Sequence, residues 1–285
     1  MNETIYILLP VHNRREITGR FIRCLRDQSY PRYHLVLLDD GSTDGTADMV
    51  RGQIPALTVI AGNGNWWWAG ALQAGYQWLR TRNPPVSDLI LIINDDTEFD
   101  GHFLASAVSF LQERRKTFLL AQCYDKENKS LIDAGIHVNW TTFTFEQPSD
   151  DKPVNCLSTR GLFFRVDDFN AVGGFHPFLL PHYLADYEFT VRAHRKGMSL
   201  MTDPAIRVRL DASTTGYHFI ETKKPFLRSV TSVFLRKSAI NPLALSVFAA
   251  LAAPWSRKFG CVLRVWTLML SHGWALLMRK GPWNS

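Results

Sequence analysis

The sequence lacks acidic residues altogether after Glu221, although ten lysine and arginine residues follow. The first 221 residues carry 22 basic and 26 acidic side chains, so the net charge of +6 comes entirely from the last part of the chain. A basic segment without acids is typical of a surface that meets an anionic partner. We therefore predict two units, a domain over residues 1–221 and a basic extension over residues 222–285.

Cysteine is scarce, and its spacing shows no Cys-x-x-Cys or Cys/His pattern that would hold zinc or form a redox pair. We expect reduced, mostly buried thiols at Cys24, Cys123, Cys156 and Cys261. The N-terminus has no basic segment ahead of its first apolar run, which argues against a secretory signal. We therefore expect a cytoplasmic protein.

Long apolar runs are missing as well. Residues 243–253 are apolar but few, with a proline at each end, and residues 259–278 contain Arg264 and His272. A spanning helix needs about 20 mainly apolar residues. Neither segment meets that requirement.

What is present is an ordinary globular composition, with 46% hydrophobic and 20% charged residues in a chain of 285. In the first part of the chain, short apolar runs alternate with segments of helical periodicity. We expect strands at 5–9, 34–38, 57–61 and 89–93, and helices at 14–28, 43–51 (capped by Ser42 or Thr43) and 69–80. Nearly continuous apolar strands separated by helices predict a mostly parallel α/β sheet covered on both faces.

The second half is less regular. We expect helices at 101–115, 167–171 and 184–196, strands at 118–123, 132–138, 161–166, 199–202 and 206–209, and a polar loop at 141–151. Ligands of such sheets bind beyond the carboxyl ends of the strands. The acidic and glycine-rich segments of the chain stand at those ends.

Asn94-Asp95-Asp96 follows the most apolar strand. Adjacent carboxylates repel each other unless a cation lies beside them, and Mg²⁺ and Mn²⁺ prefer carboxylate and phosphate oxygens. A solvated turn is the plain alternative. Asp39-Asp40 ends a second strand of the same sheet, where a carboxylate could accept from a base or a ribose, or form only a turn and a helix cap.

The loop over residues 62–70 combines three glycines with three consecutive tryptophans. Its glycines let main-chain N–H groups approach a ligand, and the helix that follows can face phosphate. The alternative for each tryptophan is core packing or a lid.

Asp186 opens the helix predicted at 184–196. A carboxylate there gains from the helix dipole, so capping alone could explain it. The functional interpretation is a general base that takes a proton from an acceptor hydroxyl, with Glu188 orienting the site and Arg192 as the ion-pair partner of Glu188.

Taken in order, these motifs resemble family 2 glycosyltransferases. The motifs are Pro10-Val11-His12-Asn13-Arg14, residues 39–46, residues 62–70, Asn94-Asp95-Asp96, Gly173-Gly174-Phe175 and Asp186-Tyr187-Glu188-Phe189. The resemblance covers residues 4 to about 210. It implies a GT-A fold and inverting transfer from a nucleoside diphosphate sugar. Ala185 and Glu188 depart from the family's common Glu-Asp-x-Asp pattern, and Asn94 replaces the first acid of its D-x-D motif.

The resemblance also implies roles by position. Asp186 falls on the catalytic base. Asp96 falls on the ligand of a divalent metal, Mg or Mn, and His218 is a candidate second ligand or a plain polar residue. Donor contacts are implied at Pro10, Val11, His12, Asp40 (to the base), Gly64, Trp67 and Asp95 (to the ribose or the sugar).

The basic extension carries an apolar helical stripe of Phe259, Val262, Leu263, Trp266, Leu270, Trp274 and Leu277. A basic, tryptophan-bearing amphipathic segment suits an anionic membrane surface. Packing on the catalytic domain or on a second subunit is the alternative, and leaves a homodimer open. Nucleic acid is not expected, because the segment is apolar rather than a polar basic groove.

We therefore expect a glycosyltransferase that moves a sugar from a UDP- or dTDP-linked donor to a glycan or lipid-linked acceptor in surface polysaccharide synthesis. It would act peripherally at the inner face of the cell membrane. The alternatives are a nucleotidyltransferase and a non-catalytic, membrane-associated nucleotide-sugar-binding protein. Against the nucleotidyltransferase, Pro10-Val11-His12-Asn13 is not a glycine-rich, basic loop after the first strand.

Overall fold

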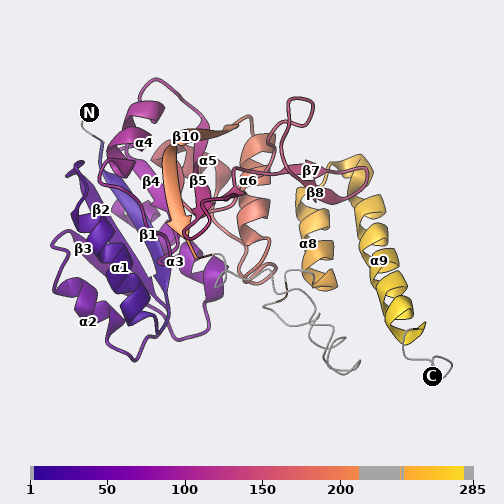
Figure 1. The fold of residues 1–285 in the computed structure, drawn as a ribbon, viewed down its shortest axis with the longest axis horizontal. Coiled ribbons are helices and arrows are strands. Elements are labelled where there is room, and N and C mark those ends of the chain that lie inside the picture. The colour runs from indigo at the N-terminus through magenta and orange to yellow at the C-terminus, as the bar shows by residue number, and fades with distance from the viewer. Residues whose placement is uncertain (1–2, 212–237, 239–240, 279–285) are drawn as a thin grey trace.

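The computed structural model describes residues 3–211, 238 and 241–278, with side chains as far as Ser271. An eight-stranded sheet forms its centre (Figure 1). In spatial order the sheet consists of β10 (Ser199–Leu210), β5 (Thr117–Asp125), β9 (Leu162–Arg165), β4 (Leu89–Ile92), β1 (Ile5–Val11), β2 (Tyr33–Asp39) and β3 (Leu57–Ala61), with β6 (Leu131–Asp133) paired to β5.

The sheet is mostly parallel, as predicted. Strand β1 pairs in parallel with β2 and β4, β2 with β3, and β10 with β5, whereas β9 runs antiparallel between β4 and β5. The carboxyl ends of β1, β2 and β4 therefore lie side by side at one edge.

Helices cover both faces because side chains along each strand alternate between two cores. In β1, Ile5, Ile7 and Leu9 enter one core, and Tyr6 and Leu8 enter the other. The first core is covered by α1 (Arg15–Arg26), α2 (Thr46–Arg51) and α4 (Phe103–Leu111), and the second by α3 (Trp67–Arg82), α5 (Val166–Val172) and α6 (Ala185–Arg195).

The C-terminal helices extend the second core. Helix α8 (Pro242–Ala252) buries Phe248 against it, and α9 (Lys258–Met278) follows the short helix η1 (Trp255–Arg257) and adds Cys261 and Val265. A small hairpin of β7 (His137–Asn139) and β8 (Thr144–Glu146) packs beside α8, where Phe145 lies 5.9 Å from Phe248 between ring centroids. Helices α8 and α9 lie at the opposite end of the molecule from β2 and β3 (Figure 1).

Several local predictions were wrong. Helix α2 begins at Thr46, not at residue 43, and neither Ser42 nor Thr43 caps it, because Asp44 accepts from the Thr46 N–H at 3.0 Å. The strand predicted at 132–138 divides into β6 and β7, and the loop predicted at 141–151 contains β8.

The two strands predicted at 199–202 and 206–209 form one strand, β10, with a register shift between Asp203 and Arg207. Continuous pairing with β5 holds the two halves together across Pro204. The predicted boundary at residues 221 and 222 lies outside the described residues.

Candidate active site

The two acidic strand ends flank β1 at the carboxyl edge of the sheet. Asp40 follows β2, and Asp95 and Asp96 follow β4. The main chain ties Asp40 to the central strand, since its N–H donates to the carbonyl of Val11 at 2.9 Å. The parallel register brings these segments together, as the sequence predicted.

Asp95 and Asp96 share one cationic neighbour. Arg14 places Nη1 3.3 Å from Oδ1 of Asp95 and Nη2 3.4 Å from Oδ2 of Asp96. Asp95 also accepts from the hydroxyl of Thr18 at 2.9 Å and is only 3% exposed. Burial raises the pKa of Asp95 to about 6, opposed by Arg14 and reinforced by Asp96.

Two buried oxygens at this strand end have no hydrogen-bond partner, Oδ1 of Asn94 and Oδ1 of Asp96. An unsatisfied buried carboxylate oxygen is costly and suits a cation. Within the described residues no group of three or more His, Cys, Asp or Glu side chains converges as a complete metal site. The unpartnered oxygens of Asn94 and Asp96 fit a divalent ion that takes few protein ligands and completes its shell with phosphate oxygens, as Mg²⁺ commonly does.

The Asp40 carboxylate binds the loop that carries the tryptophans. Its Oδ1 accepts from the N–H of Gly64 at 2.8 Å, and its Oδ2 accepts from the N–H groups of Trp66 at 2.8 Å and Trp67 at 3.1 Å. Gly62 lies so close that a Cβ there would be 2.7 Å from Asp40 Oδ1. Sequence patterns alone gave no sign that this carboxylate holds the loop.

The other donor-binding candidates lie on the same edge. Nδ1 of His12 donates to the carbonyl of Asp40 at 2.6 Å, and Pro10 and Val11 pair with the end of β2. Trp67 begins α3 with a positive φ of 56°, and its ring centroid lies 5.8 Å from that of His182. The structure thus brings Pro10, Val11, His12, Asp40, Gly64 and Trp67 together. His218 lies outside the described residues.

Asp186 stands in the first turn of α6, after Leu184 in the left-handed region with φ 68°. Its Oδ1 accepts from the N–H of Tyr187 at 2.9 Å. Burial raises the pKa of Asp186 to about 6, while Arg160 opposes the rise and Asp133 adds to it. A carboxyl group with such a pKa is suited to accept a proton near neutral pH.

Two further charged residues, Arg160 and Asp133, influence the pKa of Asp186, and the sequence motifs did not point to them. Asp133 accepts from Ser158 Oγ at 2.6 Å and from the N–H of Gly135 at 2.9 Å. Burial lowers the pKa of Arg160, but nearby acidic groups, led by Asp133, outweigh this effect and raise that pKa above its usual value. No sequence motif marks either residue, because β6 and the loop before β9 meet only in the fold.

Cys123 in β5 is a fully buried thiol that several charged side chains influence. Burial raises its pKa to about 12; Arg160 opposes the rise, and Asp133 and Asp96 add to it. Asp96 thus acts on the same thiol as Asp133 and Arg160, which in turn act on Asp186.

Glu188 and Arg192 form the predicted ion pair, at 2.8 Å and 2.9 Å through Nε and Nη2. Arg192 also donates to the carbonyls of Val172 and Gly174 at 2.7 Å each. The pair therefore fixes the turn at Gly173 and Gly174 against α6.

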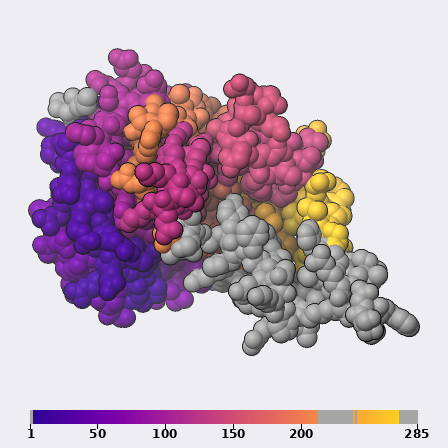
Figure 2. All heavy atoms as spheres, in the orientation of Figure 1, coloured from indigo at the N-terminus to yellow at the C-terminus, as the bar shows by residue number. Residues whose placement is uncertain are grey.

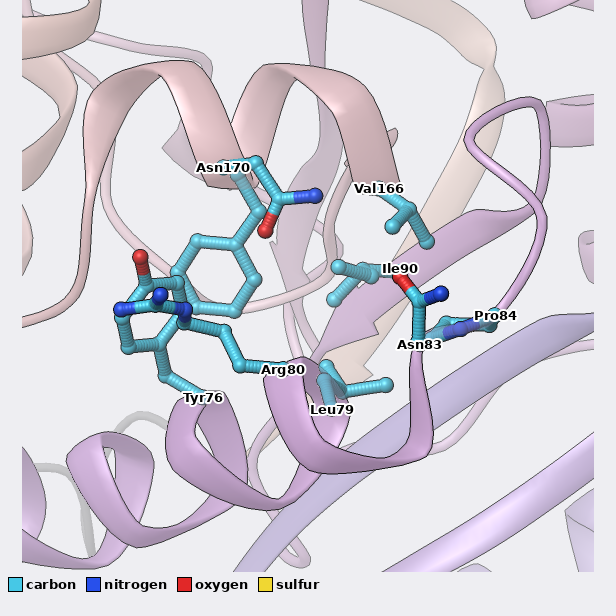
Figure 3. Close-up of a pocket in the computed structure, with 9 residues that line it drawn as sticks. Tyr76, Leu79, Arg80, Asn83, Pro84, Ile90, Val166 and Asn170 are labelled. Atoms are coloured by element: carbon cyan, nitrogen blue, oxygen red, sulfur yellow. The ribbon is translucent and has the colours of Figure 1, made fainter.

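A pocket of about 420 Å³ lies elsewhere, at the far end of α3 (Figure 3). It is lined by the polar side chains of Arg80, Asn83 and Asn170 and by apolar ones that include Ile90 and Val166. Because α3 starts at the carboxyl edge and ends here, this pocket is separated from Asp40 by the length of the helix. It is not the site of the acidic strand ends.

The arrangement of sheet and acidic edge is that of a GT-A glycosyltransferase. The family model described as "Glycosyl transferase family 2" matches residues 6–173, and the chain belongs to this family. The resemblance stated from the motifs is thereby confirmed, and the protein is a glycosyltransferase. The match ends before α6 and so does not include Asp186.

Solved structures support the same fold. The structure resembles TarS residues 1–349 from S. aureus over 94% of this chain and 72% of the TarS chain, with a TM-score of 0.59 and 14% identity. It resembles the mannosyltransferase PcManGT from Pyrobaculum calidifontis, in complex with GDP-Man and Mn²⁺, over 100% and 88%, with a TM-score of 0.58 and 18% identity. It also resembles GalNAc-T7 with UDP, GalNAc and Mn²⁺, over 92% of this chain and 54% of the other, with a TM-score of 0.60 and 13% identity. A search of curated proteins found no match.

Proposed function

We propose that this glycosyltransferase moves a sugar from a nucleoside diphosphate donor, UDP- or dTDP-linked, to a hydroxyl of a glycan or lipid-linked acceptor, with inversion at the anomeric carbon. The observation that carries the proposal is the acidic carboxyl edge of the sheet, where the buried Oδ1 of Asp96 has no hydrogen-bond partner. The Asp186 carboxyl group, whose pKa burial raises to about 6, would serve as the base. In an inverting single displacement, a base deprotonates the attacking hydroxyl while the diphosphate departs.

Asp96 would hold a divalent ion, Mg or Mn, with Asp95 beside it. When bound, this ion would neutralise the charge that develops on the departing diphosphate. The unpartnered buried Oδ1 of Asp96 supports this role. The structures of PcManGT and GalNAc-T7 also contain Mn²⁺.

The donor would lie along the carboxyl edge between Asp40 and Asp96. The Asp40 carboxylate supports that site by fixing the position of the loop at Gly64, Trp66 and Trp67. The TarS structure with UDP-GlcNAc and the PcManGT structure with GDP-Man support a nucleotide-sugar donor. The family assignment favours this function over a nucleotidyltransferase or a binding protein without activity.

The test is turnover of a panel of nucleotide sugars with Mn²⁺ or Mg²⁺. Donor hydrolysis that requires the metal is expected in the native chain, and Asp96→Ala should abolish the metal dependence. Asp186→Asn should bind donor normally and lose transfer. If no donor is turned over, or if Asp186→Asn transfers at the native rate, the proposal fails.

The acceptor side of the proposal rests on α9. No helix of the described residues is long and apolar enough to span a bilayer. The predicted stripe divides in the structure: Val262 and Trp266 pack against the second core, beside the buried Cys261 and Val265. By contrast, Phe259, Leu263 and Leu270 are 81%, 53% and 70% exposed. Along a helix, residues 259, 263 and 270 fall on one face. Helix α9 lies at the outer edge of the molecule (Figure 2).

Basic and aromatic groups adjoin this exposed face. Trp255 is 86% exposed, and the Lys258 ammonium lies 5.5 Å from the centroid of its ring. Arg257 and Arg264 are exposed, and no acidic side chain occurs anywhere after Glu221. Charge complementarity therefore favours an anionic bilayer surface as the occupant, consistent with a lipid-linked acceptor.

Vesicle sedimentation tests this surface. The full chain should bind vesicles that contain phosphatidylglycerol, less so at high salt, and hardly bind phosphatidylcholine alone. A Phe259→Ser, Leu263→Ser, Leu270→Ser variant should lose binding, whereas Val86→Ser, at an exposed valine elsewhere, should retain it. If the triple variant instead dissociates a dimer and the native chain ignores vesicles, a second copy covers the face and the membrane role is refuted.

A further inference from the structure

Arg14 is the one part of the acidic site whose role the proposed function leaves open. Its guanidinium spans both carboxylates, with Nη1 3.3 Å from Asp95 and Nη2 3.4 Å from Asp96. A single cationic side chain thus occupies the position between two acids where charge compensation is needed.

The backbone beneath Arg14 is held in place from both sides. Asn13 adopts a left-handed φ of 51°, its N–H donates to Ser42 Oγ at 2.9 Å, and its Oδ1 accepts from the N–H of Thr43 at 2.8 Å. The Arg14 carbonyl accepts the first helical hydrogen bond of α1, from Thr18 at 2.8 Å. Only the side chain of Arg14 is left free to change position.

The contacts of that side chain are loose. Charge-assisted N–H···O bonds are typically about 2.7–2.9 Å long, and both Arg14 contacts exceed this range. By contrast, the Arg192–Glu188 contacts of 2.8 Å and 2.9 Å lie within it. Arg14 is also 38% exposed, so water screens the pair. The guanidinium is therefore held weakly enough to be displaced.

Charge balance explains why displacement would depend on the donor. The two carboxylates and the guanidinium together carry one negative charge. A divalent cation arriving alone would make this partly buried group net positive, with two cations competing for Asp96. A nucleoside diphosphate sugar brings two negative charges, which balance the divalent cation and return the total charge of the group to one negative charge.

We propose that Arg14 is the resident counter-ion of the Asp95–Asp96 pair, and that it makes binding of the divalent cation at Asp96 depend on the nucleoside diphosphate. The inference rests on the proposed function, because it assumes the metal role of Asp96. Once displaced from Asp96, the guanidinium remains within a side-chain length of the site and presents the planar fork that matches phosphate oxygens. Arg14 is thus a positioning residue that links metal binding to donor binding.

The experiment measures Mn²⁺ binding directly, from the electron paramagnetic resonance signal of the free ion, with and without UDP and with GDP as a second probe. In the native chain, the nucleotide should strengthen Mn²⁺ binding by about tenfold or more, the scale of one partly screened ion pair. Arg14→Ala should bind Mn²⁺ without nucleotide about tenfold more tightly, and the nucleotide should then add little. Arg15→Ala, which removes a neighbouring exposed arginine, should behave as the native chain.

The outcomes separate the two proposals. If Asp96→Asn leaves Mn²⁺ binding unchanged in every background, the metal role fails, whatever Arg14 does. If Asp96→Asn abolishes binding but Arg14→Ala matches the native chain, the metal role stands and the counter-ion inference is overturned. Equal tightening by Arg14→Ala and Arg15→Ala would also overturn it, since the effect would then be one of general surface charge.

Discussion

The Asp40 carboxylate oxygen Oδ2 accepts a hydrogen bond from the main-chain N–H of Trp66 at 2.8 Å. The same carboxylate binds the N–H groups of Gly64 and Trp67, so one side chain organises the whole turn into α3. Three of its lone-pair directions are thereby used inside the protein. The resemblance to the family implies that Asp40 also contacts the base of the nucleotide. Such a contact would have to use the remaining lone-pair direction of this carboxylate.

Asp40→Asn tests which role dominates. The amide keeps one acceptor oxygen and turns an NH₂ group toward main-chain N–H donors, so at least one donor is left unpaired. We expect the free energy of unfolding to fall by about 1–3 kcal/mol, together with a change in tryptophan fluorescence and weaker nucleotide binding. Chemical denaturation and nucleotide titration measure these effects.

The matched control for Asp40 is Asp39→Asn. Asp39 Oδ1 accepts only from the N–H of Ser42, at 2.9 Å, and an amide oxygen can replace it there. We expect little change in stability. If Asp40→Asn loses nucleotide binding while stability and fluorescence stay native, a direct contact to the donor outweighs the loop-holding role.

Asp186 should impose a pH dependence on both rate and stability. Because burial raises its pKa to about 6, the base is protonated below that pH. We expect kcat/KM to fall by about tenfold per pH unit below 6, as for one essential base. A pH–rate profile measures this, and a profile flat through pH 5 would contradict the role of Asp186 as base.

The stability effect has the opposite sign from that of a salt-bridged aspartate. With its pKa raised in the folded state, Asp186 binds its proton more tightly there than in the unfolded chain. The free energy of unfolding therefore falls as the pH rises from the ordinary pKa of an aspartate to about 6, and it stays low at higher pH. Asp186→Asn should then stabilise the fold at pH 7.5 by about 2 kcal/mol and hardly at all at acid pH. The exposed Glu127→Gln should show no such difference between the two pH values in thermal unfolding.

The buried Glu188–Arg192 pair should be structural in effect. Arg192→Ala leaves Glu188, only 3% exposed, without its main partner and frees the carbonyls of Val172 and Gly174. We expect a loss of about 3–5 kcal/mol in denaturant unfolding. The double variant Glu188→Gln, Arg192→Met should lose less than Arg192→Ala, because no unpaired charge remains. Equal losses would mean that the carbonyl contacts, not the charge, carry the effect.

The sheet could be predicted because its strands are nearly all apolar, and a strand buried on both faces has no other composition available. Strand β4, which is buried along its whole length, lies within the residues predicted, at Leu89–Ile92. The start of α2 could not be predicted from local rules, since Ser42 accepts from Asn13 instead of capping the helix, whereas its end at Arg51 lies where predicted. A segment distant in sequence had taken the capping side chain.

The site was predictable in part, because it depends on the same parallel sheet. Acidic residues at strand ends are visible in the sequence, and a parallel sheet must bring them to one edge. The contacts of Arg14, Arg160 and Asp133 were not visible, because they depend on which loops meet after folding. The stripe on α9 was visible, but periodicity could not show that Trp266 packs against the core while Leu263 faces solvent.

Gly174 should tolerate no side chain. A Cβ there would lie 2.1 Å from Oε1 of Gln73 and 2.5 Å from Cδ1 of Tyr76. Gln73 cannot simply move away, because its Oε1 accepts from the N–H of Phe175 at 2.7 Å. We expect Gly174→Ala to lower the free energy of unfolding by about 1–3 kcal/mol, as overpacking does.

Gly197→Ala is the control: its φ of 84° is unfavourable for alanine, but no atom lies within 4 Å of a Cβ built there. It should lose only about 1 kcal/mol through backbone strain. If denaturant unfolding finds the two variants equally stable, Gln73 gives way without cost, and the turn at Gly173 and Gly174 is held by Arg192 alone.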